Sequence, residues 1–266
     1  HRLREALAAA GLKARMLSND AANEEADWFH RVEAAHDVVV YAGDQPDSPW
    51  TQLCLRQADK VLLVAASGET VMSHPLAGAE RGRLKRQMPE LVVLRAAGRA
   101  ATTQPHRAEQ MYGVCYALDP HDQKDVAHLA RMLTGRAVGL VFAGGGARGF
   151  AHIGVARALH EAGVPFDLLG GTSMGAIIAA GLACGWAIDE LSDRMRRVFV
   201  DTNPLNDFTI PLIALYRGRK VTNLLKEHFG DVAIESLPRT FFCTSSDLTS
   251  GRTAIQRSPT TNCRSF

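Results

Sequence analysis

The stretch Val138-Gly-Leu-Val-Phe-Ala-Gly-Gly-Gly-Ala-Arg-Gly149 decides the fold of the second half of the chain. Its first six residues predict a buried strand that runs into glycines, and a helix closed by Gly163 is expected to follow. A second strand, Phe166–Leu169, enters another glycine turn at residues 170–175, and an apolar helix rises from that turn. Two successive strand–turn–helix units predict neighbouring parallel strands in a layered α/β sheet.

The rest of the chain alternates short apolar strands with amphipathic helices in the same way. Before residue 136 we expect strands at Asp37–Ala42, Lys60–Ala65, Leu91–Leu94 and Val114–Ala117, and helices at Arg2–Ala10, Ala21–Ala35, Thr51–Ala58 and Asp122–Leu133. After the second turn we expect helices at Ile188–Phe199 and Val221–Phe229, and a strand at Thr240–Thr244 with Gly251–Gln256 as its candidate partner. These elements predict a three-layer α/β/α domain with a mainly parallel sheet in residues 136–266, preceded by a smaller Rossmann-like α/β region in residues 1–135.

Composition and charge argue against several classes of protein. Of the 266 residues, 46% are hydrophobic and 22% are charged, which is typical of a globular chain. The net charge of +2 is too close to zero to indicate a nucleic-acid partner. The five cysteines form no CxxC pair, so neither a zinc site nor a disulfide framework is indicated, and reduced thiols are expected.

The sequence also gives expectations about location and completeness. No apolar run reaches the roughly 18 residues of a membrane-spanning helix, and the first residues lack the apolar centre of a signal peptide. We therefore expect a cytoplasmic protein without metal or cofactor, and leave peripheral contact with the inner membrane open. The chain starts with His1 and ends in a polar tail, which we interpret as a fragment of a longer protein.

The first glycine turn, residues 144–149, fits the G-x-G-x-x-G pattern of dinucleotide-binding proteins. Such proteins also carry an acidic residue where the next strand ends. Here that strand ends in Gly170-Gly171, and Asp167 stands at its beginning instead. Nucleotide binding is therefore the weaker of two interpretations of this turn.

The second turn, Gly171-Thr-Ser-Met-Gly175, fits G-x-S-x-G between a strand and a helix, which is the setting of a nucleophile elbow. Small residues must flank the serine so that strand and helix can approach closely. Ser173 is the predicted nucleophile, although an ordinary tight glycine turn is the alternative. Since both turns should lie at the carboxyl edge of one sheet, backbone N–H groups of Gly144–Gly146 would stabilise an oxyanion beside Ser173.

These residues resemble the patatin-like phospholipase family. The family pattern is Gly-Gly-Gly-Ala-Arg-Gly, then Phe150-Ala-His-Ile-Gly-Val, then Gly-Thr-Ser-Met-Gly. The neuropathy target esterase branch and its bacterial relatives are more similar still. The segments that carry this second resemblance are Phe208-Thr-Ile-Pro-Leu, Arg217-Gly-Arg-Lys-Val, Phe241-Phe-Cys, Ser48-Pro-Trp-Thr-Gln and Arg56-Gln-Ala-Asp-Lys.

The resemblance implies a Ser–Asp dyad without a catalytic histidine, acting on acyl esters of phospholipids or lysophospholipids and needing no cofactor. Ser173 would be the nucleophile of this lipid acyl hydrolase. The oxyanion hole would be lined by Gly144, Gly145, Gly146 and Arg148; the elbow would include Gly171, Thr172, Met174 and Gly175, and the glycine loop Ala147 and Gly149. Relatives often carry cyclic-nucleotide-binding domains upstream, which are a further implied partner outside this chain.

The chain departs from the family in one respect. The family's aspartate stands in an Asp-Gly-Gly or Asp-Gly-Ala turn, and no aspartate here precedes a glycine. Asp231 and Asp247 are the nearest late candidates, and neither fits. We therefore expect the dyad aspartate to be missing from this chain. An inactive fragment or a lipid-binding pseudoenzyme remains an alternative, because a serine without a base is a weak nucleophile.

Residues 1–135 resemble the later part of a ParA/MinD-type NTPase, on Asp37-Val-Val-Val-Tyr and Ala58-Asp-Lys-Val-Leu-Leu-Val. No G-x-x-x-x-G-K-[ST] loop is present, which favours a degenerate structural or coupling domain.

Four further features near the turns have a structural interpretation beside any functional one. We expect His152 to be structural and Cys184 to be packed in the core. A role for Arg148 beyond the surface is left open. The basic residues Arg194, Arg196 and Arg197 next to Val198–Val200 are expected to form a solvated helix face, with contact to anionic lipid as the alternative.

Overall fold

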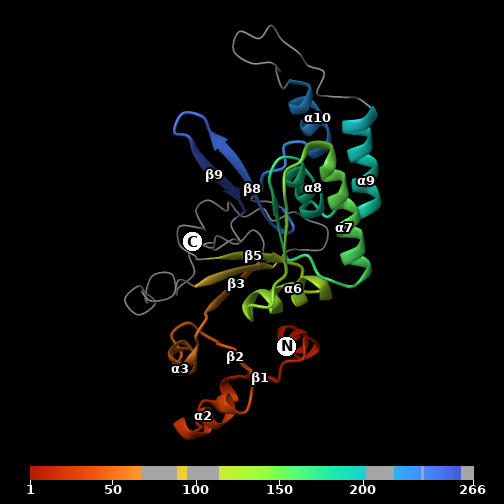
Figure 1. Cartoon of the computed structure of the whole chain (residues 1–266). Coiled ribbons are helices and arrows are strands. Elements are labelled where there is room, and N and C mark those ends of the chain that lie inside the picture. Colours follow the sequence, from red (N-terminus) through yellow and green to blue (C-terminus); the bar gives the residue numbers. More distant parts are fainter. Residues whose placement is uncertain (67–88, 95–113, 202–218, 235–236, 259–266) are drawn as a thin grey trace. The chain divides into compact units, whose positions relative to one another are not determined.

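The computed structural model describes residues 1–66, 89–94, 114–201, 219–234 and 237–258. The chain divides between Ala137 and Val138 into two compact units, and each is described by itself. Both units are α/β, with mainly parallel sheets and helices packed against them, as the sequence predicts (Figure 1).

The first unit begins with a two-stranded parallel sheet. Strand β1 (Ala14–Leu17) pairs with β2 (Val38–Tyr41), with Ala14 opposite Val38. Strand β1 is not among the predicted strands, because its four residues include the charged Arg15 and form no apolar run. The helices around this pair are α1 (Arg2–Ala9), α2 (Ala26–Ala34), α3 (Pro49–Gln57) and the short 3₁₀ turn η1 (Asn19–Ala21).

A single helix over Ala21–Ala35 is a wrong prediction, since η1 and α2 are separate. Helix α3 starts at Pro49, two residues earlier than predicted, because the Ser48 hydroxyl accepts from Thr51 N and caps the helix.

The second sheet of this unit is parallel throughout, in the order β3 (Leu62–Ala66), β4 (Glu90–Leu94), β5 (Cys115–Leu118). In the central strand Leu91, Val92 and Val93 are all buried, which is typical of a parallel strand covered on both faces. Helix α6 (Gln123–Leu133) follows β5, and the Asp122 carboxylate caps it by accepting from Lys124 N.

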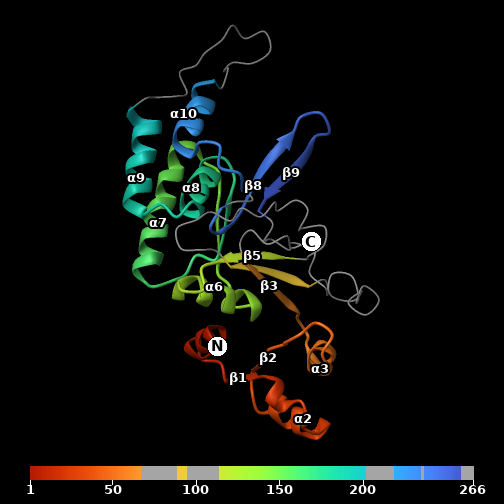
Figure 2. The ribbon, with the colours of Figure 1, turned by 180° about the vertical axis from the view of Figure 1, so that it is seen from behind.

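The second unit holds a four-stranded sheet in the order β6 (Gly139–Phe142), β7 (Leu168–Gly171), β8 (Thr240–Asp247), β9 (Arg252–Arg257). The first three strands are parallel and β9 runs antiparallel to β8. The pairing predicted for the last segment is confirmed, and Figure 2 shows the two strands as a projecting hairpin.

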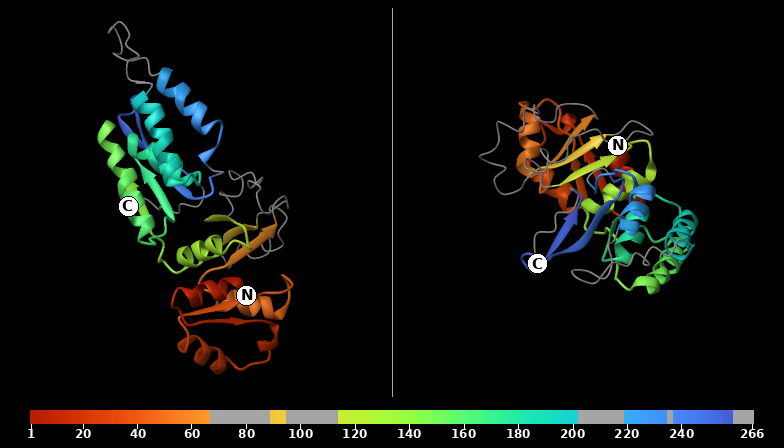
Figure 3. Two further views of the ribbon diagram at one scale, coloured as in Figure 1. Left: turned by 90° about the vertical axis from the view of Figure 1, so that its right-hand side faces the viewer. Right: turned by 90° about the horizontal axis from the view of Figure 1, so that it is seen from above.

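Helix α8 (Met174–Ala183) packs against β6, β7 and β8, and α7 (Phe150–Glu161) and α9 (Ile188–Arg196) pack against α8 and against each other. The 3₁₀ turn η4 (Gly146–Gly149) precedes α7, and a wider π-type turn, η5 (Arg197–Asp201), replaces the predicted last turn of α9. Helix α10 (Arg219–Phe229) lies beside α9, as both Figure 1 and Figure 3 show.

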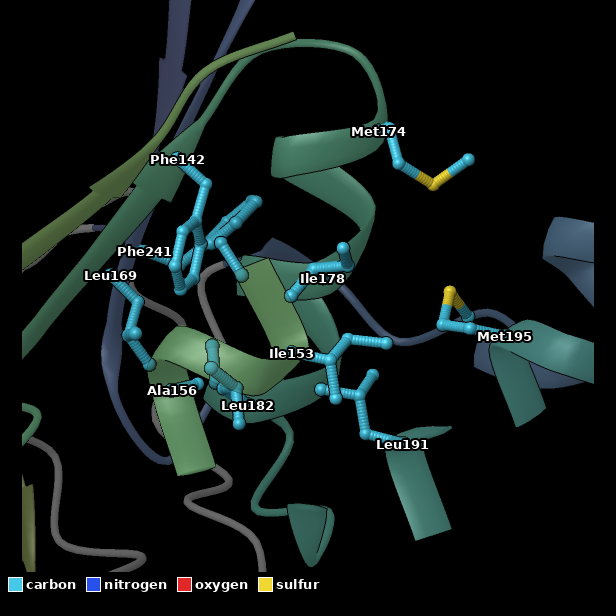
Figure 4. Packing of buried hydrophobic residues seen from close by; sticks show 12 residues of the cluster. Phe142, Ile153, Ala156, Leu169, Met174, Ile178, Leu182, Leu191, Met195 and Phe241 are labelled. Carbon is cyan, nitrogen blue, oxygen red and sulfur yellow. The ribbon is translucent and has the colours of Figure 1, made fainter. Parts of the chain in front are cut away.

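The core of the second unit joins the sheet to these helices. Phe142, Leu169 and Phe241 come from β6, β7 and β8, and they meet apolar side chains of the three helices (Figure 4). The helix residues that are almost fully buried are Ala156, Ile178, Ala179, Ala183, Leu191 and Met195. Because one core spans both glycine turns, the turns are held by the packing of the whole unit.

In the first unit, Asp44 organises the loop that follows β2. Its carboxylate accepts hydrogen bonds from the hydroxyls of Ser48 and Thr51 and from Asn19 Nδ2, which lies 2.9 Å away. The Ser48 hydroxyl above all, and then that of Thr51, lowers the pKa of Asp44. The same carboxylate thus ties the end of β2 to the start of α3 and to the turn after β1.

We predict that Leu191→Ala lowers the free energy of unfolding of the second unit by about 2–5 kcal/mol, because Leu191 is 0% exposed and its loss leaves a cavity. The matched control is Leu248→Ala, since Leu248 is 95% exposed, and it should change stability by less than about 0.5 kcal/mol. Denaturant unfolding of the two variants checks this. Equal effects would contradict the assigned core.

We predict that Asp44→Asn destabilises the first unit in a pH-dependent way. A carboxyl whose folded pKa is lowered contributes stability above its unfolded pKa, and that stability is lost as the pH falls through the folded value. The difference in unfolding midpoint between wild type and variant should therefore have its largest value above about pH 5 and decrease towards about pH 3. Asp47→Asn, at an exposed position of the same loop, is the control. A pH-independent difference would contradict the prediction.

Candidate active site

The two glycine turns meet at the carboxyl edge of the second unit's sheet. The strand register places Phe142 opposite Gly171, and Gly171 opposite Cys243. Strands β6 and β7 end at Phe142 and Gly171, so both glycine turns leave the sheet at the same edge, where open α/β sheets bind ligands, while β8 continues to Asp247 in its pairing with β9.

Ser173 has a strained backbone conformation at this edge. Its φ of 54° and ψ of −126° make it the one non-glycine residue with positive φ in the part of the chain that the structure describes. Such a conformation persists only where the surroundings hold it. Here Thr172 N donates to Phe142 O (3.1 Å), Gly175 N donates to Thr172 O (3.0 Å), and the first turn of α8 begins on Ser173 O.

The flanking glycines are required by close approach. A Cβ added to Gly171 would lie 2.6 Å from the carbonyl carbon of Gly175. A Cβ on Gly175 would collide with the carbonyl oxygens of Phe142 and Ala143 at the end of β6. Helix α8 can therefore start directly against the strands only because both positions lack side chains, which is the geometry of a nucleophile elbow.

The first glycine turn lies against the second. An added Cβ on Gly144 would be 3.4 Å from Ser173 Cβ and 3.5 Å from Thr172 O, so a side chain at this position would touch the elbow and the two turns lie close together. Gly146 has a φ of +54°, which favours glycine. Gly149 is buried with no room for a Cβ beside Met174. The predicted site residues Gly144–Gly149 and Gly171–Gly175 are thus brought together, and Gly144–Arg148, Thr172 and Ser173 are exposed.

Arg148 stands in this loop with its side chain exposed. Its backbone N–H donates to Gly145 O (3.1 Å), so that donor already has a partner. Any contribution of Arg148 to an anion site must therefore come from its guanidinium, and the free backbone donors must come from the glycines.

His152 supports the loop from α7. Its Nε2 lies 2.9 Å from Ala143 O, and its ring lies 5.0 Å from that of Phe142. Both contacts are with the end of β6, which agrees with the structural role expected for this histidine.

The aspartates near these strands are engaged elsewhere. Asp167 is fully buried and accepts from Val138 N (3.0 Å) at the opposite end of β7. Asp247 closes the β8–β9 turn, where the Ser250 hydroxyl and Thr249 N donate to it and lower its pKa. Asp231 is exposed just after α10. None of these hydrogen bonds involves Ser173.

One contact of the elbow lies outside the two glycine motifs. Thr172 Oγ1 lies 2.7 Å from Thr244 Oγ1, which joins the elbow to β8. A strand at Thr240–Thr244 is predictable, but its register against β7 is not, so no sequence signal marks this pair.

The expected basic face on α9 needs correction at Arg194. Its guanidinium lies over the Trp186 ring, 4.3 Å from the centroid, and pairs with Glu190 (2.7 Å). Trp186 in turn stacks on Phe229 of α10 at 4.7 Å. Arg194 is therefore part of the packing between α9 and α10, while Arg196 and Arg197 are exposed.

Other expectations have simpler outcomes. Cys184 is half-buried at the end of α8, and burial raises the pKa of its thiol. The segments that start at Phe208 and Arg217 lie wholly or partly outside the described residues.

Within the ranges that are described, no group of three or more His, Cys, Asp or Glu side chains is arranged to hold a metal ion. No helix there has the length and apolar character needed to cross a membrane.

Comparison with known families matches both halves of the chain. Residues 140–266 match the patatin-like phospholipase family, and residues 1–94 match the neuropathy target esterase family P-loop like domain. A patatin-like phospholipase domain therefore carries the elbow and the glycine loop described above. With both domains present, the chain belongs to the neuropathy target esterase branch of this family, as the resemblance of its motifs indicates.

Several curated relatives carry that name. The chain is 34% identical over 272 residues to neuropathy target esterase sws of Drosophila persimilis and likewise to that of Drosophila mojavensis, and 33% identical to that of Drosophila melanogaster. Each alignment covers 86% of this chain but only 18% or 19% of the relative. The chain thus spans under a fifth of the length of these proteins.

We predict that Gly175→Ala disrupts the elbow, because its Cβ would lie 2.7 Å from the carbonyl carbon of Phe142 and β6 or α8 must shift. The expected cost is about 1–3 kcal/mol, with loss of Ser173 reactivity. Gly154→Ala in α7 is the matched control: its Cβ meets nothing within 4 Å, and it should stabilise by about 0.5–1 kcal/mol. Thermal unfolding and fluorophosphonate labelling measure both effects. If Gly175→Ala keeps the wild-type thermal midpoint and labelling rate, this account of the elbow is wrong.

Proposed function

We propose that the site is that of a serine-dependent lipid acyl hydrolase in which Ser173 is the nucleophile. The observation that carries the proposal is that Gly144 lies close to Ser173, whose backbone is held at φ 54° at the start of α8. The patatin-like phospholipase match and the relatives named as esterases support the same reaction class.

In this proposal Ser173 Oγ attacks the ester carbonyl and its proton passes to a base. The tetrahedral intermediate then expels the alcohol, which takes up a proton, and leaves an acyl-serine. Water attacks the acyl-serine and releases the fatty acid with the serine restored. Substrates are phospholipids or lysophospholipids, whose exposed ester can reach Ser173 at the open edge of the sheet.

The oxyanion is stabilised by backbone N–H groups of Gly144, Gly145 and Gly146 and by the N-terminal end of α8. The exposed guanidinium of Arg148 adds positive charge to the same side. The remaining residues of the two turns serve the geometry: Gly171 and Gly175 permit the close approach, Thr172 and Met174 flank the serine, and Ala147 and Gly149 complete the loop.

A Ser–Asp dyad needs a carboxylate near Ser173 Oγ. Asp167 is committed at the far end of β7 and Asp247 is committed to the hairpin turn. We therefore propose that the dyad aspartate is not one of the described residues. His152 is not offered as the base, because its Nε2 is directed at Ala143 O.

The first unit is proposed as a structural or coupling domain. It matches a P-loop like domain by family, but the sequence has no G-x-x-x-x-G-K-[ST] loop to bind phosphates. Residues 1–135 and 136–266 are proposed as the functional division of the chain. Peripheral contact with the cytoplasmic face of a membrane and an upstream cyclic-nucleotide-binding domain belong to the same proposal.

Two alternative functions can each be distinguished from the hydrolase by one experiment. A lipid-binding pseudoenzyme keeps the elbow but leaves Ser173 unreactive, so covalent labelling by a fluorophosphonate counts against it. A nucleotide-binding protein would use Gly144–Gly149, and calorimetry without a heat of binding for dinucleotides removes it.

We predict that Ser173→Ala in the intact protein lowers hydrolysis of a short-chain chromogenic ester by at least about 10³-fold, because the covalent path is lost. Fluorophosphonate labelling should disappear with it. Ser192→Ala on α9 is the matched serine control and should keep both activities. If Ser173→Ala hydrolyses the ester at the wild-type rate, the proposed function is wrong.

A further inference from the structure

Thr244 on β8 lies next to the elbow although its strand carries none of the motif residues. Its Oγ1 is 2.7 Å from Oγ1 of Thr172, the residue directly before Ser173. Either hydroxyl can donate, so the pair forms one hydrogen bond between the residue after β7 and the middle of β8. Thr244 is half-buried, and Thr172 is exposed at the sheet edge.

The pair belongs to a continuous row of cross-strand contacts. Gly170 lies opposite Phe242 in the register, and the Phe242 ring occupies the space where a side chain of Gly170 would be. Thr244 stands two residues after Phe242 and so on the same face of β8, because side chains alternate with a period of two. Its partner Thr172 stands two residues after Gly170, directly after the end of β7. Strand β8 therefore contacts β7 through the Phe242 ring and the residue after β7 through the Thr244 hydroxyl.

Strand β8 is itself fixed on its other side. Thr244 lies opposite Ile255 of β9, and Ser258 Oγ accepts from Phe241 N (2.9 Å) beside it. The Thr244 hydroxyl is thus presented by a hairpin that is hydrogen-bonded along its length.

Thr172 is the residue through which this contact can reach the nucleophile. Its N–H and its carbonyl are both used, by Phe142 O and Gly175 N respectively. The side-chain bond to Thr244 supplies a third restraint from a different strand. Because Ser173 has a φ that non-glycine residues rarely adopt, restraints on the preceding residue bear directly on where its Oγ points.

We propose that Thr244 is a positioning residue for Ser173, acting through the hydroxyl of Thr172. This inference rests on the proposed function, since it assigns Thr244 to the alignment of the same nucleophile. It extends the active site to β8, which the two glycine motifs do not include.

The test compares Thr244→Val, which removes the hydroxyl at nearly constant volume, with Thr244→Ser, which keeps it. In the intact protein, Thr244→Val should lower both kcat for a chromogenic ester and the rate of fluorophosphonate labelling by about three- to tenfold, which corresponds to one hydrogen bond. KM and the thermal midpoint should change little. Thr244→Ser should restore the rate to within about twofold of wild type.

Thr172→Val and the double variant Thr172→Val/Thr244→Val complete the cycle. If the hydroxyls act as a pair, the double variant is as slow as the single ones rather than the product of both effects. Thr253→Val on β9 is the matched control, since it makes the same change at an exposed position of the hairpin and should keep the wild-type rate.

The outcomes separate the inference from the proposed function. If Ser173→Ala abolishes labelling while Thr244→Val labels at the wild-type rate, the role of Thr244 is overturned and the nucleophile stands. If Ser173→Ala labels normally, both fall. If Thr244→Val lowers the thermal midpoint, its slower rate could come from instability, and Thr172→Val and Thr244→Ser are then the test. A wild-type rate in Thr172→Val overturns the inference.

Discussion

The close contact between the start of α8 and the ends of β6 and β7 is the constraint on which the second unit depends. It requires bare backbone at Gly171 and Gly175, since a side chain at either position would collide with neighbouring main-chain atoms. This contact turns the chain sharply enough to give Ser173 its positive φ. The same contact draws the Gly144 loop to the serine, because that loop continues from the strand that α8 touches.

The core beneath the edge makes this arrangement stable. Phe142, Leu169 and Phe241 come from three adjacent strands and pack in one core with side chains of α7, α8 and α9. The strain at Ser173 is therefore held by packing that extends well beyond the site. The exposed residues at the edge, Ser173 among them, are not part of this core.

The sequence predicts much of the fold around the candidate site. The strand–turn–helix units around residues 138–149 and 166–176 predict two parallel strands with glycine turns at one edge, and the structure has them. Errors occur where local pattern is weak. The short β1 contains a charged residue, the helix predicted over Ala21–Ala35 is divided, and the end of α9 widens into η5. Arg194 was expected in solvent because its stacking on Trp186 depends on how α9 meets α8 and α10.

The sequence by itself determined the nucleophile elbow and the glycine loop. Each needs small residues at a fixed spacing within a few consecutive positions, so a short stretch of sequence is enough to identify it. Only the tertiary structure decided that Gly144 lies close to Ser173 and that Thr244 reaches Thr172. The Thr172–Thr244 pair joins residues 72 positions apart and follows from strand register, whereas the Arg148 N–H is occupied within its own turn by Gly145 O. Register is set by the packing of the whole sheet against its helices, which no local pattern encodes.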